Sequence, residues 1–190
     1  MNVHARYPTT PDEFVRWNEN REGRREFVRG TVVEMMINTT IRHAVIASRL
    51  TAILLRQFPY PEFFVGSADV AVRTHAGIRY PDVFVDRGSP EHGDLGLVAE
   101  HPVLLAEVLS SSSVGRDFLE KAAEYTAIPS LRFYLVASQD EPRVWLWARD
   151  AQDAWQEPQE TEGTEPVVSL SDLDATLPLA ELYAGIEPRR

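Results

Sequence analysis

The sequence predicts a mixed α/β fold in which helices flank a central mixed β-sheet. Two short apolar runs, residues 81–85 and 103–109, contain enough β-branched side chains to be buried strands. Apolar residues also recur at the helical period over residues 41–58. The predicted order is α-β-β-α-β-β-β-α-β-β, an arrangement in which helices pack on one sheet.

Capping and turn signals define the N-terminal elements. Threonine caps both predicted helices of this part of the chain. Proline supplies the first position of the first helix and ends the second helix. The elements are a short helix opened by the capping box of residues 10–13, a hairpin at 25–35 that turns at Arg29-Gly30, and a helix over 41–58 capped by Thr39 or Thr40.

The remaining elements are short runs bounded by turn residues. They are strands at 63–65, 69–73, 132–137 and 143–148, a helix over 114–127, one strand holding Trp155, and a terminal helix over 178–183. Residues 86–101 form a loop of a length that is usually functional or mobile. Neither an internal repeat nor a linker is present, so we expect one domain over residues 1–190.

The composition is that of a globular domain. With 190 residues, 44% hydrophobic and 25% charged, the chain can bury about 70% of its unfolded surface. The absence of cysteine excludes disulfides and thiolate metal ligands. No run approaches the ~20 apolar residues of a membrane span, and no signal-peptide core precedes the domain. We therefore expect a cytoplasmic protein with no membrane association.

The charge is unevenly distributed. The net charge of −10 argues against a broad nucleic-acid-binding surface. Residues 1–60, however, hold nine arginines and six acids, whereas residues 61–190 hold ten bases and 23 acids. Six of those acids, and no base, lie between Asp150 and Glu165. The distribution permits a local basic face in the N-terminal half.

Each of the two apolar runs carries one carboxylate, Asp82 in the first and Glu107 in the second. A buried carboxylate is costly unless a cation or hydrogen-bond donors satisfy it. Because side chains alternate along a strand, Glu107 shares a face with Leu105, and Asp82 shares a face with Phe84. Neighbouring strands could therefore present both carboxylates to one pocket, a site for a hard divalent metal.

Lys121 is the only lysine among 19 basic residues and follows Glu107 by fourteen positions. In the predicted helix, Asp117, Lys121 and Glu124 form a polar stripe. The opposite, apolar face should rest on the sheet and consists of Phe118, Ala122 and Tyr125. Two carboxylates and one ammonium group together predict a metal site that cleaves phosphodiesters.

These residues resemble the Uma-type restriction endonuclease family, a branch of the PD-(D/E)XK nuclease superfamily. The resemblance spans almost the whole chain and implies a restriction-endonuclease-like core. The matching positions are residues 10–14, residues 25–30, His43 at the start of the long helix, Tyr80-Pro81-Asp82-Val83, Glu107-Val108-Leu109-Ser110, and Asp117 with Lys121 and Tyr125.

The resemblance implies Mg²⁺, or Mn²⁺, bound by Asp82 and Glu107, with Glu26 as an additional ligand or base. The superfamily motif places lysine two residues after the glutamate, where this chain has Leu109. Lys121 matches the position to which this branch moves the lysine. His43, Asp117 and Tyr125 are accessory candidates.

Simpler roles remain open for each residue. Asp82 after proline could mark a turn, and Lys121 could merely pair with Asp117 on a solvated helix face. Glu26 could pair with Arg24 or Arg29 on an exposed hairpin, and His43 could be a capping or surface histidine. Trp145 and Trp147 share a strand face and favour packing or an oligomer contact over base stacking.

Two functions compete. The first is a Mg²⁺-dependent endonuclease that hydrolyses DNA, for which cutting both strands of a duplex would favour a homodimer. The second is a catalytically silent relative that uses the fold for nucleic-acid binding or oligomerisation. A two-carboxylate glycosidase is less attractive, because no aromatic and polar cluster for sugars lies near Asp82 or Glu107 in the sequence.

Overall fold

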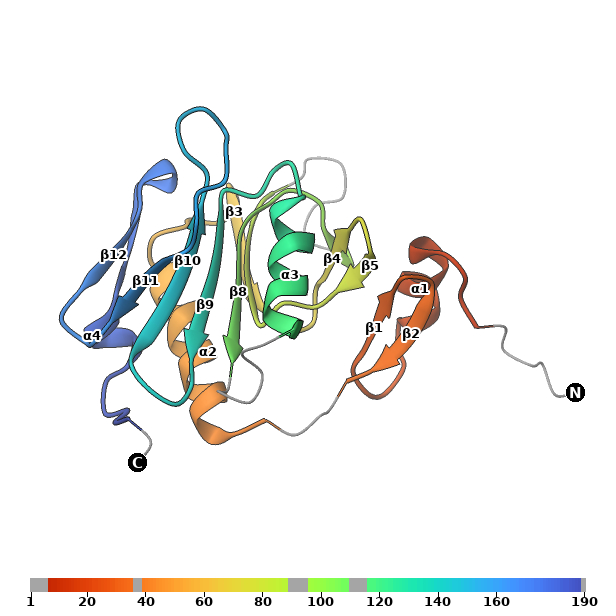
Figure 1. Ribbon diagram of the computed structural model, residues 1–190. Coiled ribbons are helices and arrows are strands. Elements are labelled where there is room, and N and C mark those ends of the chain that lie inside the picture. The colour runs from red at the N-terminus through yellow and green to blue at the C-terminus, as the bar shows by residue number, and fades with distance from the viewer. Residues whose placement is uncertain (1–6, 36–38, 89–95, 110–115, 189–190) are drawn as a thin grey trace, which may run out of the picture.

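The computed structural model describes residues 7–35, 39–88, 96–109 and 116–188 (Figure 1). Its helices are α1 (Pro11–Asn18), α2 (Ile41–Leu55), α3 (Arg116–Thr126) and α4 (Leu179–Leu182). Its strands are β1 (Arg25–Val28), β2 (Thr31–Glu34), β3 (Phe63–Ser67), β4 (Ala71–Thr74), β5 (Gly77–Arg79), β6 (Val83–Arg87), β7 (Val98–Ala99), β8 (Pro102–Leu109), β9 (Phe133–Ser138), β10 (Arg143–Ala148), β11 (Gln159–Glu162), β12 (Val167–Leu170) and β13 (Ala175–Pro178).

A six-stranded mixed sheet in the order β11-β10-β9-β8-β6-β3 forms the centre of the molecule. Only β8 and β9 run parallel within it, and α3 connects them as a crossover helix. All eight residues of β8 are buried, which fits the continuous apolar run at its centre. The predicted mixed α/β class, with helices on a central sheet, is confirmed.

The two faces of the central sheet have different coverings. On one face α2 buries Ile46, Leu50 and Ile53 in a core that also takes residues from α4, β12 and β13. On the other face α3 packs Ala122 and Tyr125 against β8 and β9. In Figure 1, α2 lies behind the sheet and α3 lies in front of it. The predicted apolar face of α3 therefore rests on the sheet.

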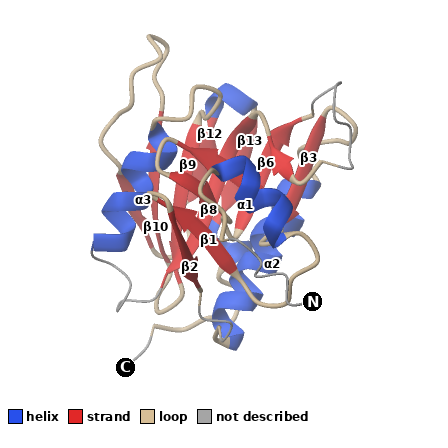
Figure 2. Cartoon of the chain, turned by 90° about the vertical axis from the view of Figure 1, so that its right-hand side faces the viewer, coloured by secondary structure: helices blue, strands red, loops and turns tan. Residues whose placement is uncertain are grey.

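A second sheet, β2-β1-β5-β4-β7, extends from the α3 side of the molecule. It includes the predicted hairpin, in which Val28 pairs with Thr31 around Arg29-Gly30. Figure 2 views the molecule from this side, with α1 and β1 in front of the central sheet. A small core of Phe14, Phe27, Ala71 and Ile78 joins α1 to the second sheet. No helix among the described residues is long and apolar enough to span a membrane.

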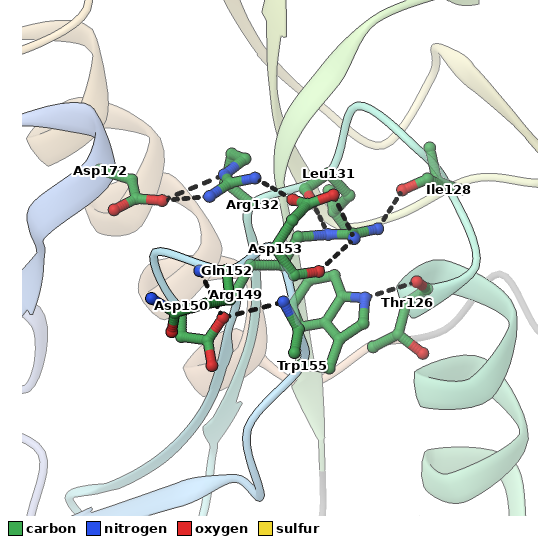
Figure 3. Close-up of polar contacts among 11 residues, drawn as sticks. Thr126, Ile128, Leu131, Arg132, Arg149, Asp150, Gln152, Asp153, Trp155 and Asp172 are labelled. Carbon is green, nitrogen blue, oxygen red and sulfur yellow. Dashed lines mark hydrogen bonds and ion pairs between the residues drawn. The ribbon is translucent and has the colours of Figure 1, made fainter.

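The prediction of a strand at Trp155 is wrong. Residues 149–155 form a turn in which the carboxylate of Asp150 accepts hydrogen bonds from the backbone N–H groups of Gln152 and Ala154. Only an isolated bridge pairs Arg149 with Trp155. The indole Nε1 of Trp155 instead donates to the carbonyl of Thr126, 2.6 Å away, at the end of α3 (Figure 3). The turn therefore ties the end of α3 to the sheet.

The other differences lie in short or marginal elements. Helix α2 ends at Leu55, three residues before the predicted end, and the chain continues as a turn in which the N–H groups of Gln57 and Phe58 both donate to the carbonyl of Leu54. The short strands β5 and β7, and the β12–β13 pair, were not predicted. Each has two to four residues, too few for an alternating pattern to stand out.

Gly77 fixes how the hairpin joins the second sheet. It begins β5 opposite Val28 of β1, and its φ of +146° lies in a region that L side chains rarely adopt. A Cβ at this position would lie 1.8 Å from the carbonyl oxygen of Phe27. Only glycine therefore allows the close approach of β5 to β1.

We expect Gly77→Ala to lower the free energy of unfolding by about 3 kcal/mol or more, since both the positive φ and the backbone clash oppose the methyl group. Gly163→Ala is the matched control, because Gly163 also has a positive φ, of +86°, but open space around its Cβ position. The control should lose only about 1–2 kcal/mol. Urea unfolding measures both, and equal losses would refute the proposed close approach.

Candidate active site

Asp82 and Glu107 meet at two adjacent strands: Asp82 lies in a bend directly before β6, which begins two residues later than predicted, and Glu107 lies within β8. Val83 of β6 pairs with Ala106 of β8, and the antiparallel register carried one residue further sets Asp82 opposite Glu107. Phe84 points to the same face of the sheet as Asp82, and Leu105 to the same face as Glu107. Both apolar residues belong to the core on the α3 side. Both carboxylates therefore lie on the α3 side of the central sheet, as the alternation predicts.

Asp82 is held by two donors at a single oxygen. Its Oδ2 accepts a hydrogen bond of 2.9 Å from the backbone N–H of Val108 and lies 3.0 Å from Nε2 of His43. Burial acts to raise the pKa of Asp82, but the hydrogen bond and charge of His43, the Val108 N–H and the charge of Lys121 together hold it below the ordinary value. Asp82 is therefore an ionised carboxylate.

His43 reaches Asp82 from the first turn of α2. Thr40 caps this helix, and its Oγ1 accepts a hydrogen bond from the backbone N–H of His43. The cap thereby fixes the first turn, from which the imidazole extends to Asp82. The side chain of His43 thus bonds a site carboxylate, whereas only its backbone takes part in capping.

Glu107 is almost completely buried, with 3% of its surface exposed. Its Oε1 accepts hydrogen bonds from Nζ of Lys121 at 3.0 Å and from the hydroxyl of Tyr125 at 2.9 Å. Burial raises the pKa of Glu107 to about 7, the Lys121 charge opposes this rise, and the Asp82 charge adds to it. Glu107 therefore exchanges a proton near neutral pH.

Helix α3 brings its polar stripe inward. Lys121 and Glu124 are 6% and 3% exposed, so the alternative of a solvated helix face is wrong for Lys121, and Glu124 is buried beside it. Lys121 pairs with Glu107, and the side chain of Asp117 lies outside the described residues. Burial and the Glu107 charge raise the pKa of Tyr125, which keeps its hydroxyl protonated as a donor.

Arg79 holds Glu26 and Glu124 in a buried ion cluster that sequence reasoning missed. Its Nη1 lies 2.6 Å from Glu26 of β1, and its Nε and Nη2 contact both oxygens of Glu124 on α3 at 2.8 and 2.6 Å. The three residues are 2–5% exposed. These hydrogen bonds and charges outweigh burial and raise the pKa of Arg79. Glu26 thus pairs with Arg79, and neither Arg24 nor Arg29 shows an ion pair among the described contacts.

One cleft of about 840 Å³ collects most of the predicted residues. Its lining includes Glu26, His43, Asp82, Glu107 and Lys121. Tyr125 contacts Glu107 from the protein core. The cleft lies between the hairpin and the α3 side of the central sheet, on elements far apart in the sequence.

The donor set of the cleft fits a hard cation bound by few protein ligands. Among the described contacts, only one oxygen of Asp82 and one of Glu107 is hydrogen-bonded, so the other oxygen of each carboxylate makes none. No group of three or more acidic or histidine side chains that could hold a metal ion occurs in the described part of the chain. Mg²⁺ commonly uses one or two carboxylates and completes its shell with water and substrate phosphate.

Comparisons with known proteins identify a family and a fold. A model of the Uma2 family, described as "Putative restriction endonuclease", matches residues 11–180. Two uncharacterized proteins of Synechocystis sp. are 29% and 24% identical to this chain; each alignment covers 77% of the chain, and 84% and 77% of the respective relatives. The crystal structure of a protein from Anabaena variabilis, described as a putative nuclease belonging to DUF820, superposes with a TM-score of 0.71.

The Anabaena protein is 15% identical in sequence, and the match covers 93% of this chain and 98% of that one. At 15% identity the structural similarity shows only a shared fold, and membership of the family rests on the match to the family model. Since the family model spans most of the chain, including both carboxylate strands and α3, the chain belongs to the Uma2 family of restriction-endonuclease-like proteins.

Proposed function

We propose that this protein is a Mg²⁺-dependent endonuclease that hydrolyses phosphodiester bonds of DNA. The observation that carries the proposal is the convergence of Asp82, Glu107 and Lys121 in one cleft. The family match to restriction endonucleases supports the reaction class. Mn²⁺ has similar oxygen-ligand chemistry and is the expected substitute.

Hydrolysis adds water across a phosphorus–oxygen bond and builds negative charge on the phosphoryl oxygens. Bound Mg²⁺ would supply Lewis-acid polarisation of the phosphate and a more acidic water. Asp82 and Glu107 would hold the ion through the oxygens that make no hydrogen bond in the protein. His43 and the Val108 N–H orient Asp82, while Tyr125 orients Glu107.

Lys121 would serve the transition state. Its ammonium lies 3.0 Å from Glu107 in a buried setting, where a preorganised positive charge acts strongly on a developing anion. The role of Glu26 as a third ligand or base stays a prediction. In the structure its carboxylate is paired with Arg79.

A catalytically silent binding module is the second candidate. The net charge of −10 favours it, because an acidic protein attracts a polyanion poorly. The Lys121–Glu107 ion pair does not decide between the two candidates, because such a buried pair can also have a purely structural role. Metal binding and cleavage separate the two functions.

Mg²⁺ or Mn²⁺ should raise the melting temperature of the protein, by a stabilisation of about 2.7 kcal/mol at a free concentration one hundred times Kd. Asp82→Asn and Glu107→Gln should abolish the rise, since each removes a ligand charge. Differential scanning fluorimetry with and without EDTA measures the effect.

Asp86→Asn is the matched control, since Asp86 is a 3%-exposed carboxylate of β6, four residues after Asp82, and accepts a hydrogen bond from the backbone N–H of His101. The metal-induced rise should survive in this variant. An undiminished rise in Asp82→Asn and Glu107→Gln would place the cation elsewhere. Glu26→Gln would reduce the rise only if Glu26 is a ligand.

The metal-free protein should lose stability as pH rises. The folded pKa of Glu107, about 7, lies above the ordinary value of 4.5, so folding takes up a proton between these values. The resulting stabilisation is fully present below pH 4.5 and is lost as pH rises through about 7.

Thermal melts from about pH 5 to pH 8 in EDTA should therefore show a decline that Glu107→Gln reduces. The difference between the two proteins isolates this residue from the other titrating groups. Parallel pH profiles for wild type and Glu107→Gln would refute the raised pKa.

Lys121→Gln should cut Mg²⁺-dependent cleavage of DNA by roughly 10²–10³-fold, comparable to the loss of one preorganised charge-stabilising donor. The glutamine keeps a donor beside Glu107, which limits the destabilisation. Lys121→Arg should rescue poorly, because a planar guanidinium cannot replace a compact ammonium group.

Nicking of supercoiled plasmid and cleavage of a single-stranded oligonucleotide measure the effect, with Mg²⁺ or EDTA. The metal-induced rise in melting temperature should persist in Lys121→Gln, which shows that the site still binds the ion. Cleavage by Lys121→Gln at the wild-type rate would exclude the transition-state role, and absence of metal-dependent cleavage by wild type would favour the silent module.

A further inference from the structure

One wall of the cleft is rich in arginine. Arg21 and Arg24 come from the connection between α1 and β1, Arg25 begins β1, and all three line the cleft. The carboxylates Asp82 and Glu107 come instead from the central sheet. The cleft thus combines an acidic pair at the central sheet with a cationic wall that the proposed chemistry does not use.

Most of the hydrogen-bonding capacity of this wall is not matched by carboxylates. Nε of Arg21 donates to the carbonyl of Trp17 at 2.6 Å, and Nη2 of Arg24 donates to the carbonyl of Ala68 at 3.3 Å. Neither guanidinium forms a salt bridge among the described contacts. Elsewhere in this acidic chain, Arg56 and Arg73 reach carboxylates at 2.5 and 2.7 Å.

Arg25 has a donor with no partner at all. Its Nη1 is buried and makes no hydrogen bond in the structure, and its only ion pair is a 3.7 Å contact with Glu34, whose side chain is 81% exposed. A buried, unpaired guanidinium N–H is costly, and such a donor is normally satisfied by an acceptor. The guanidinium, whose side chain is 18% exposed, therefore brings a weakly compensated positive charge to the wall of the cleft.

Aromatic and amide groups complete the wall. The guanidinium carbons of Arg21 and Arg25 lie 4.2 and 5.8 Å from the ring centroid of Trp17, which restrains both side chains. Oδ1 of Asn18 is buried without a hydrogen-bond partner, and the half-buried ring of Tyr80 also lines the cleft. The wall therefore offers cationic, polar and stacking groups together.

The size of the cleft limits what can enter. A volume of about 840 Å³ lies within the range of small-molecule pockets, roughly 300–1,000 Å³. Glu107 and Lys121, which are proposed to act at the phosphate, are only 3% and 6% exposed. Proteins that bind duplex DNA present broad, strongly positive surfaces instead. A single strand, whose backbone and bases can enter separately, fits this cleft better.

We propose that Arg21, Arg24 and Arg25 form a subsite for backbone phosphates, and that its occupant is a single-stranded nucleic acid. The inference rests on the proposed nuclease function and names the form of its substrate. The strand crosses the arginine wall while the adjoining phosphodiester reaches Lys121 and the two carboxylates. A groove with basic and aromatic groups is the general means of binding a single strand.

The acidic residues of the cleft set the strength of this binding. Glu19, Glu34 and Asp69 also line it, so the attraction is confined to the three arginines. Three phosphate contacts on a single strand predict a slope of about −2 in log K against log salt, or a loss of about 20-fold between 50 and 200 mM. Each arginine removed should reduce the slope by about 0.7.

The test measures binding apart from cleavage. Fluorescence anisotropy of a labelled single-stranded DNA oligonucleotide, and of the same sequence as a duplex, is recorded with Lys121→Gln protein in Mg²⁺. Arg21→Gln, Arg24→Gln and Arg25→Gln are added singly to this background. Arg16→Gln is the matched control, because Arg16 also lies on the α1 segment, donates to a backbone carbonyl and is absent from the cleft lining.

We expect the single strand to bind at least tenfold more tightly than the duplex, and each cleft variant to weaken it several-fold with a shallower salt slope. Arg16→Gln should bind as the background protein does. Equal binding of the duplex, or unchanged binding in Arg21→Gln and Arg24→Gln, would overturn the subsite. These two side chains are partly exposed or solvent-facing, so the test stands even if Arg25→Gln does not fold.

The outcomes for the proposed function are separate. If the wild-type protein cleaves neither DNA form with Mg²⁺ yet the arginine variants weaken single-strand binding, the subsite holds and the nuclease proposal fails. If wild-type protein cleaves DNA yet the arginine variants bind normally, the nuclease proposal holds and the subsite fails.

Discussion

The buried carboxylate of Glu107 is the constraint around which this fold is organised. It lies in β8, a strand buried along its whole length, where an isolated charge would be strongly unfavourable. Two donors from α3, Lys121 and Tyr125, converge on one of its oxygens. The crossover helix must therefore pack on this face of the sheet and in this rotation, which also directs Lys121 into the cleft.

Arg79 extends this organisation to the second sheet. By binding Glu26 of β1 and both oxygens of Glu124 on α3, it links the hairpin to the helix that carries Lys121. Because the hairpin and the adjoining α1–β1 connection form the arginine wall, the position of that wall depends on the same buried cluster. At the C-terminal end of the same helix, Trp155 bonds the carbonyl of Thr126, and Arg149 bonds the carbonyl of Ile128 just beyond it. The C-terminal part of α3 is thus tied both to the second sheet and to the end of β10.

Sequence reasoning reached the parts of the site that leave a local pattern. Asp82 and Glu107 stand out because each interrupts an apolar run, and strand alternation is enough to put them on one face. Lys121 stands out as the only lysine, and the apolar face of its helix leaves it pointing to the cleft side. The identity of the metal as Mg²⁺, the DNA substrate and the role of Glu26 came from the family resemblance, and with the metal site itself they remain proposals.

What sequence reasoning missed depends on contacts among three or more elements. Arg79 lies in β5, a three-residue strand, and its partners are 53 and 45 positions away in the sequence. Glu124 was predicted only as part of a polar stripe, because its partner could not be seen from its own helix. Trp155 was predicted to lie in a strand within a solvated acidic loop. The composition of that loop does not reveal the turn at Asp150, or the hydrogen bond from the indole to the end of α3.

The placement of β8 has a consequence for motion within the cleft. This strand is bonded on both sides, to β6 and β9, and fully enclosed, so its amides should exchange with solvent only when the whole domain unfolds. Arg21 and Arg24 belong to an irregular connection, and Arg25 is the first residue of β1. This segment is largely half-exposed or exposed, and such segments open locally at much lower free energy. The two carboxylates would then keep a constant spacing while the wall that grips the strand adjusts around different bases.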